Sequence, residues 1–189
     1  MNINKIQTIL LFSIIYLSSI CFAGNNDNAG CSIDMDITSI NYENILSQSD
    51  IDYQINAVEG ERINVAVVAQ NVQNLDTYQV EIKYDNSKLK YIFASEEFEI
   101  IGVENLLTKN NGKTIGFQSV EKTPGIINIA NTLIKSDTLQ APEGSGVIAV
   151  LVFNVIKNGQ TTLELSNVNF IDSFGNEDKI DNLTNGMIE

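Results

Sequence analysis

The sequence predicts an all-β sandwich of about nine strands, and three observations support this fold class. From about residue 51 onward, short segments rich in β-branched residues are separated by turn residues at intervals of roughly 8 to 15 positions, a spacing typical of β-sandwiches. Residues 77–84 alternate between apolar and polar side chains, as a strand with one buried and one solvated face does. Finally, the flexible turn Gly144-Ser145-Gly146 leads into an uninterrupted apolar run at 147–153.

This apolar run is the expected centre of the fold. Four of its seven residues are β-branched, the run is short and glycine precedes it, so a strand is favoured over a buried helix. Because every position is apolar, both faces of the strand need cover, one from the second sheet and the other from loops or neighbouring elements.

The other elements follow from the positions of β-rich segments and turns. The expected strands are 53–58, 62–70, 77–84, 89–94, 114–120, 126–133, 146–155, 161–168 and 186–188. Both prolines fall between these strands, where their missing N–H breaks no sheet hydrogen bond. In 114–120, we expect Ile115 and Phe117 to share the core side. Residues 103–107 are compatible with a helical turn.

The N-terminal 23 residues have the pattern of a secretory signal peptide. They carry Lys5, no acidic residue, and an apolar stretch at 9–20 that is too short to span a membrane comfortably. Small residues at Cys21 and Ala23 predict cleavage after Ala23. No second apolar stretch approaches roughly 20 residues, so we expect no membrane span and a secreted, extracellular or cell-surface protein.

Residues 24–50 are rich in Asn, Asp, Ser and Gly and predict a polar leader or linker, followed by one globular domain at 51–189. The alternation at 33–37 leaves an edge strand open as an alternative. Cys31 remains alone once Cys21 is removed, so no internal disulfide is expected and its thiol would lie in the leader. Asp34 and Asp36 suggest a calcium loop, but the rest of that pattern is absent.

Composition argues against several functions. The formal net charge of −13 makes nucleic acid and anionic membranes poor partners. The chain has no histidine, which excludes Ser-His-Asp and Cys-His catalysis and the usual zinc sites. Glu96, Glu97 and Glu99 form the densest acidic cluster, but Glu96 and Glu97 are neighbours that would point to opposite faces of a strand. We interpret the cluster as a solvated loop or strand edge and expect a non-enzyme without cofactors.

Five sequence blocks, in this order and spacing, resemble a cohesin domain over residues 51–189. The blocks are Val58-Glu59-Gly60-Glu61-Arg62-Ile63-Asn64-Val65-Ala66-Val67, Tyr84-Asp85-Asn86-Ser87-Lys88-Leu89, Gly144-Ser145-Gly146-Val147-Ile148-Ala149, Leu165-Ser166-Asn167-Val168 with Ile171-Asp172-Ser173-Phe174-Gly175-Asn176, and Asn185-Gly186-Met187-Ile188. The resemblance implies a nine-stranded jelly-roll β-sandwich that docks a dockerin-like module on another protein. Calcium would be bound by that partner, and polysaccharide breakdown or surface assembly is the implied setting.

The resemblance also implies a partner-binding face on the third, fifth and sixth expected strands. Carried over by position, its residues are Thr77, Gln79, Gly116, Gln118, Glu121 and Asn128. Cellulosomal cohesins often carry Asn and Asp where Thr77 and Gln79 stand, and loss of a carboxylate weakens charge-assisted hydrogen bonds. The sequence therefore predicts a partner other than a standard cellulosomal dockerin. Ordinary solvated sheet residues remain the alternative interpretation of this set.

Two other functions stay open at the level of the sequence. The same sandwich serves carbohydrate-binding modules, so polysaccharide is an alternative partner, and Tyr53, Tyr91, Phe98 and Phe174 are the aromatic candidates for stacking on sugar rings. The absence of Trp argues against a flat platform for crystalline polysaccharide. An adhesive surface protein that self-associates through edge strands needs no special residues.

Overall fold

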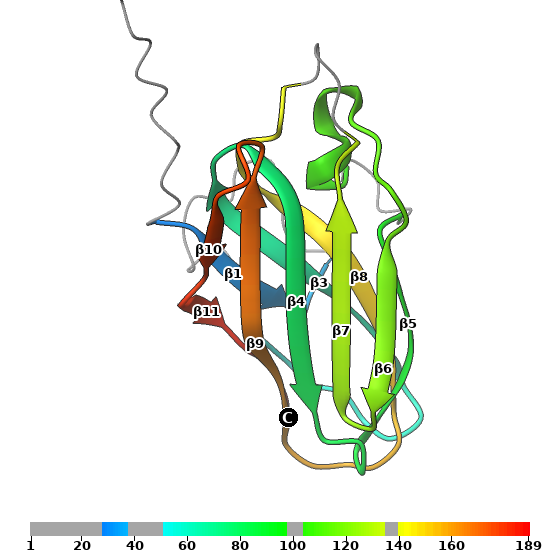
Figure 1. The fold of residues 1–189 in the computed structure, drawn as a ribbon. Coiled ribbons are helices and arrows are strands. Elements are labelled where there is room, and N and C mark those ends of the chain that lie inside the picture. Colours follow the sequence, from blue (N-terminus) through cyan, green and yellow to red (C-terminus); the bar gives the residue numbers. More distant parts are fainter. Residues whose placement is uncertain (1–27, 38–50, 98–103, 135–139) are drawn as a thin grey trace, which may run out of the picture.

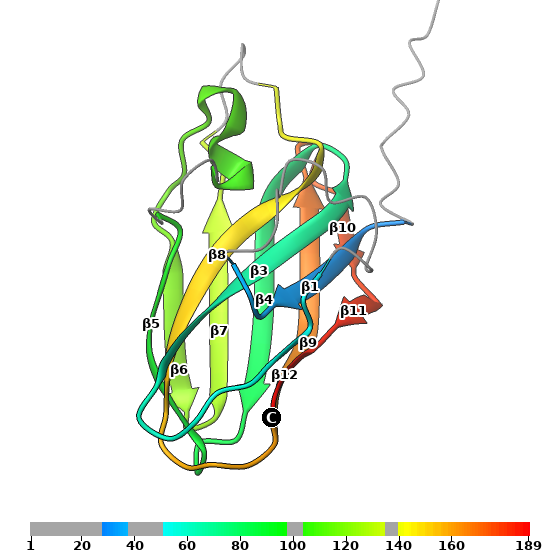
Figure 2. The ribbon, with the colours of Figure 1, turned by 180° about the vertical axis from the view of Figure 1, so that it is seen from behind.

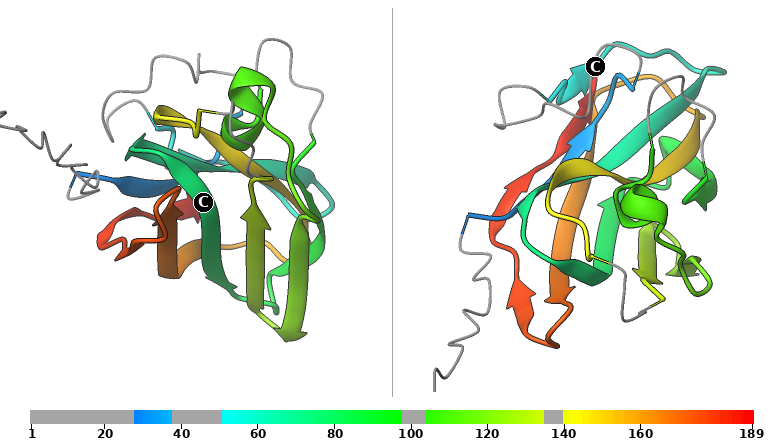
Figure 3. Two further views of the ribbon diagram at one scale, coloured as in Figure 1. Left: turned by 45° about the horizontal axis from the view of Figure 1, so that its top comes forward. Right: turned by 90° about the horizontal axis from the view of Figure 1, so that it is seen from above.

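The computed structural model describes residues 28–37, 51–97, 104–134 and 140–189, which form two facing β-sheets. Figures 1 and 2 show the sandwich from its two sides, and Figure 3 shows it tilted and from above. The five-stranded sheet has the order β11 (Asn182–Thr184), β1 (Gly30–Asp34), β3 (Arg62–Val72), β8 (Gly144–Val155) and β5 (Leu89–Ser95). The seven-stranded sheet has the order β2 (Gln54–Ile55), β12 (Gly186–Ile188), β9 (Thr161–Asp172), β4 (Leu75–Tyr84), β7 (Ile126–Thr132) and β6 (Gln118–Thr123), with β10 (Glu177–Lys179) paired to β9.

Strand β8 contains the apolar run and lies inside the five-stranded sheet between β3 and β5, as predicted. Its inward side chains, among them Leu151 and Phe153, belong to the main core between the sheets. On the outer face, Val147 and Val150 form a second buried cluster with Ala66, Val68 and Ile51, against which Ile37 packs. The run is therefore covered on both faces, which explains why it tolerates no polar position.

Strand β1 corrects the prediction that residues 24–50 are a leader. Residues 30–34 form this strand, which pairs with β3 on one side and β11 on the other, so it is an interior strand. Its neighbour Met35 and the side chains of Cys31 and Ile33 are buried in the main core. Burial raises the pKa of the Cys31 thiol well above its ordinary value, so the thiol stays neutral. The rest of the predicted leader, and the signal peptide, lie outside the described residues.

Both ends of the described chain pass from one sheet to the other. β1 pairs in parallel with β11 in the five-stranded sheet, and β2 pairs in parallel with β12 in the seven-stranded sheet. The terminal segments therefore run side by side and close one edge of the sandwich. The described residues form twelve strands, so the sandwich prediction is confirmed but the count of nine is not. β1, β10 and β11 are the additional strands, and β2 is shorter than the expected 53–58.

A bend corrects the expected fifth strand. Gly116 has φ +61, which interrupts the alternation, and the regular strand β6 begins only at Gln118. As a result Ile115 is 64% exposed, although it was expected on the core side with Phe117, which does pack against the core. Upstream, the helical turn is a 3-10 helix, η3 (Leu106–Asn111), slightly later than the expected 103–107.

Candidate functional site

The outer face of the seven-stranded sheet carries the residues expected to bind a partner. On β4, Tyr78, Val80 and Ile82 point into the core, so the residues between them face outward. Strand register sets these outward residues in rows across β4, β7 and β6. Gln79 opposes Ala130, which opposes Gln118, and in the next row Glu81 opposes Asn128, which opposes Val120.

A hollow of about 250 Å³ lies where these rows meet. The residues that line it are Gln79, Gln118, Val120, Lys122, Asn128, Ile129 and Ala130. The small side chain of Ala130 stands between the long side chains of Gln79 and Gln118 in the register, which explains the depression. The structure thus brings together three of the six predicted residues: Gln79, Gln118 and Asn128.

The other three predicted residues lie around this hollow rather than in it. Thr77 is one row further along β4, and its hydroxyl donates to Asp76 Oδ2 at 2.9 Å. Gly116 occupies the bend before β6, with no heavy atom within 4 Å of the position a Cβ would take. Glu121 has an internal role, because its Oε1 accepts hydrogen bonds from Tyr84 Oη at 2.5 Å and from the Gly125 amide at 2.8 Å. These two bonds fix the β6–β7 turn against the end of β4.

The burial of Tyr84 and its bond to Glu121 make the stability of the domain sensitive to alkaline pH. Burial, the hydrogen bond to Glu121 and the charge of that carboxylate together raise the pKa of Tyr84 to about 12. A tyrosine in the unfolded chain ionises near pH 10, so the stabilising contribution of Tyr84 is complete below about pH 10 and is lost as pH rises toward about 12. We expect Tyr84→Phe to unfold slightly more easily at neutral pH but to lose less stability between about pH 9 and 11 than the unchanged protein does. Thermal melting across this pH range measures both effects.

Tyr53→Phe is the matched control for this experiment, because Tyr53 is exposed and lies away from Glu121. An alkaline loss of stability that is equally steep in Tyr84→Phe and in the unchanged protein would contradict the assignment.

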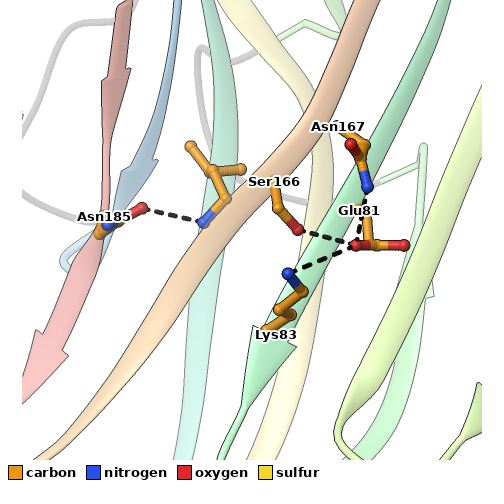
Figure 4. Close-up of polar contacts among 6 residues, drawn as sticks. Glu81, Lys83, Ser166, Asn167 and Asn185 are labelled. Atoms are coloured by element: carbon orange, nitrogen blue, oxygen red, sulfur yellow. Dashed lines mark hydrogen bonds and ion pairs between the residues drawn. The ribbon is translucent and has the colours of Figure 1, made fainter. Parts of the chain in front are cut away.

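Sequence reasoning missed Glu81, whose carboxylate is held by several polar contacts on the outer face (Figure 4). Its Oε1 accepts hydrogen bonds from Ser166 Oγ at 2.9 Å and Asn167 Nδ2 at 3.1 Å, and Lys83 Nζ lies 3.9 Å away. Asn167 has φ 46 at an irregularity in the pairing of β9 with β4. That irregularity brings two consecutive β9 side chains to the same carboxylate, and no periodic pattern in the sequence predicts it. Figure 4 also shows Asn185, whose Oδ1 accepts from the Leu165 amide at 2.9 Å where the chain enters β12.

The acidic cluster at 96–99 has a structural role in the part that is described. The Glu96 carboxylate accepts hydrogen bonds from Thr114 Oγ1 at 2.7 Å and from the buried Asn131 Nδ2 at 2.6 Å, which ties it to β7 and to the segment before β6. It also lines a second hollow of about 430 Å³ together with Glu97 and Glu104. The sequence predicted a solvated loop or strand edge here. Glu96 is instead partly buried and accepts two hydrogen bonds, whereas Glu97 is exposed. Glu99 lies outside the described residues.

The aromatic candidates for sugar stacking do not share one surface. Tyr53 and Phe174 are both 56% exposed, but Tyr53 adjoins β12 beside the start of β9, whereas Phe174 follows the end of β9. A strand rises about 3.3 Å per residue, so these two rings are separated by roughly 30 Å. Tyr91 hydrogen-bonds to Ser119 and packs on Phe153. Phe98 lies outside the described residues.

Two further properties of the described residues bear on function. They contain no group of three or more Cys, Asp and Glu side chains arranged to hold a metal ion. They also include no helix with the length and hydrophobicity needed to cross a bilayer.

Comparison with known proteins identifies the family. The cohesin domain model matches residues 48–189. Cell surface glycoprotein 1 of Acetivibrio thermocellus is 30% identical over 114 residues, which are 55% of this chain and 5% of that protein, so the chain corresponds to a small part of its relative.

Solved cohesin structures share the fold at low sequence identity. A type II cohesin from a cohesin–X–dockerin complex of Acetivibrio cellulolyticus has a TM-score of 0.62 and 20% identity, and the alignment covers 85% of this chain and 98% of that one. The sixth cohesin of scaffoldin B from the same organism, solved with a mutant dockerin, has a TM-score of 0.59 and 18% identity, covering 85% of this chain and 97% of that one. With the family model matching most of its length, the chain belongs to the cohesin family.

Proposed function

We propose that this cohesin domain is a non-catalytic docking module, secreted or held at the cell surface, that binds a dockerin-like partner on the outer face of β4, β7 and β6. The observation that carries the proposal is the hollow between Gln79, Gln118 and Asn128, which lies on an open sheet face and presents side-chain amides. Amides both donate and accept hydrogen bonds, so they suit recognition of a folded protein surface. The two cohesins compared above were solved as complexes with dockerins, which supports the same kind of partner here.

The chemistry of the face indicates what the partner presents. Gln79, Gln118 and Asn128 are neutral, and Lys122 adds a positive charge at the rim, within a chain whose net charge is −13. A strongly basic partner surface would therefore find little complementary charge at this hollow. We infer a partner whose contact surface is mainly neutral and hydrogen-bonding, with calcium bound in the partner and not in this chain.

The mature chain, immobilised and exposed to the secreted proteins of its source organism, tests the proposal. A dockerin-like protein should be retained in the presence of calcium and released by a chelator, because dockerin folding would depend on the ion. Retention of no protein, or of proteins indifferent to the chelator, would overturn the proposal.

A glycan array run in parallel tests the carbohydrate alternative, which the separated aromatic rings do not favour. Mass spectrometry of the secreted protein tests whether it begins at Gly24.

Substitution in the hollow should weaken docking without unfolding the domain. We expect Gln118→Arg to weaken binding of the captured partner at least tenfold, because a long charged side chain fills the hollow and carries an unpaired charge into the interface. Gln118 is exposed, so the melting temperature should change by only a few degrees. Binding isotherms and thermal melts measure these two effects.

Asn64→Arg provides a matched control for Gln118→Arg. It makes the same exchange of an amide for a guanidinium at an exposed position of β3, on the outer face of the opposite sheet. If Asn64→Arg weakens binding as much as Gln118→Arg does, the partner does not dock on the β4, β7 and β6 face.

A further inference from the structure

Glu81 is a carboxylate that the fold has already oriented at the edge of the hollow. It stands on β4 directly opposite Asn128, one of the residues that line the hollow, and Val120 follows in the same row on β6. The lining residues Gln79, Gln118, Asn128 and Lys122 carry no negative charge, and Glu81 adds a carboxylate beside them in the row of Asn128.

The two oxygens of Glu81 have different surroundings. Oε1 accepts from Ser166 and Asn167 and lies nearest to Lys83. Among the described residues, none donates a hydrogen bond to Oε2, which points away from these donors toward β7 in Figure 4. The side chain is 19% exposed, so solvent or a partner can reach it. One oxygen thus fixes the rotamer and leaves the other available.

We propose that Glu81 Oε2 is the anionic hydrogen-bond acceptor of the docking face, and that the partner brings a neutral donor, a hydroxyl or amide group, to it. This inference rests on the proposed function and names the residue that sets its specificity. Binding to a preoriented carboxylate costs little side-chain entropy, because Ser166 and Asn167 have already restricted its rotamers. A hydrogen bond to a carboxylate is also stronger than one to a neutral amide.

The charges around Glu81 favour a neutral donor over a cation. Lys83 Nζ lies 3.9 Å from Oε1, and Lys122 lies at the hollow on the other side of Asn128. A lysine or arginine from the partner would approach both of these positive groups at once. A hydroxyl or amide N–H gains the hydrogen bond without that repulsion.

The test uses Glu81→Gln and the calcium-loaded partner recovered in the capture experiment, purified. Glutamine keeps the length of the side chain and a carbonyl oxygen that can accept from Ser166 and Asn167, so the fold should be retained and the melting temperature should move by only a few degrees. Binding should weaken about tenfold, because the charge-assisted bond becomes a neutral one. This loss should change little between about 0.05 and 0.5 M salt, since screening acts mainly on pairs of charges.

The matched control is Glu164→Gln, which removes an exposed carboxylate from β9 one row away, opposite Lys83. We expect its affinity to stay within about twofold of the unchanged protein. Ser166→Ala removes one of the bonds that orient Glu81 and should weaken binding less than Glu81→Gln does.

The outcomes separate this inference from the proposed function. If Gln118→Arg abolishes binding while Glu81→Gln leaves it unchanged, the domain docks on this face but Glu81 is not the acceptor, and its carboxylate only holds β9 to β4. If neither substitution affects binding, the docking face itself is wrong. A loss in Glu81→Gln that disappears at high salt would show a cationic donor and overturn the neutral one.

Discussion

Ile33→Asp is expected to prevent this domain from folding. The Ile33 side chain is fully buried in the core between the sheets, and its strand β1 is paired on both sides. Truncating a buried Ile costs about 2–5 kcal/mol, and an unpaired carboxylate in its place adds a further desolvation penalty. Because whole domains are stable by only about 5–15 kcal/mol, the sum is comparable to the total. Circular dichroism and thermal melting of the purified protein measure the loss.

Two control proteins, Ile33→Val and a chain that begins at residue 51, test whether the loss of stability comes from the packing of β1. Ile33→Val removes a single methylene and should cost only about 0.5–1.5 kcal/mol, which shows that the position tolerates a smaller apolar residue but not a charge. A chain that begins at residue 51, where the sequence placed the start of the domain, lacks β1 and leaves β3 and β11 without a partner strand between them. It should be poorly soluble or unfolded. An Ile33→Asp protein that melts within a few degrees of the unchanged one would show that β1 is dispensable.

The part of the fold that could be predicted from sequence is the part in which local pattern and tertiary packing agree. The run at 147–153 is apolar because β8 is covered on both faces, and 77–84 alternates because β4 is covered on one. For β1, the sequence favoured a leader and left only an edge strand at 33–37 open, because the surrounding residues are polar, although Cys31, Ile33 and Met35 alternate as a buried strand requires. Its pairing partners are β3 and β11, and the latter lies about 150 residues further along the chain. No local window contains that information.

The candidate site shows the same division. Register across β4, β7 and β6 could be anticipated from the order of strands, and it brings Gln79, Gln118 and Asn128 together. Glu121 could not be placed from the sequence, because its position depends on the bond with Tyr84 across the β6–β7 turn. Glu81 was missed for a related reason, since its constraint comes from the irregular pairing at Asn167 of β9. Ile115 was expected on the core side of its strand but is exposed, because the positive φ of Gly116 bends the chain directly after it.

Gly186, near the C-terminal end of the described chain, packs against Ile33 and Met35, near its N-terminal end. It is buried in β12, and a Cβ at this position would lie 2.3 Å from Met35 Sδ and 2.9 Å from Ile33 Cγ2. Gly186 has no positive φ, so these side-chain contacts, and not backbone strain, oppose a larger residue. The chain returns from β11 to β12 directly before this residue and has little freedom to move away.

Gly186→Ala should therefore destabilise the domain by about 3 kcal/mol, the upper end of the usual cost of overpacking a core. Gly144→Ala is the comparison, because Gly144 has φ +93 but open space around it, and it should cost only about 1 kcal/mol through backbone strain. Combining Gly186→Ala with Met35→Ala removes the thioether that the new methyl meets, so the double variant should lose less stability than the two single changes together. Strict additivity in denaturant unfolding would mean that β12 does not pack on the segment that follows β1.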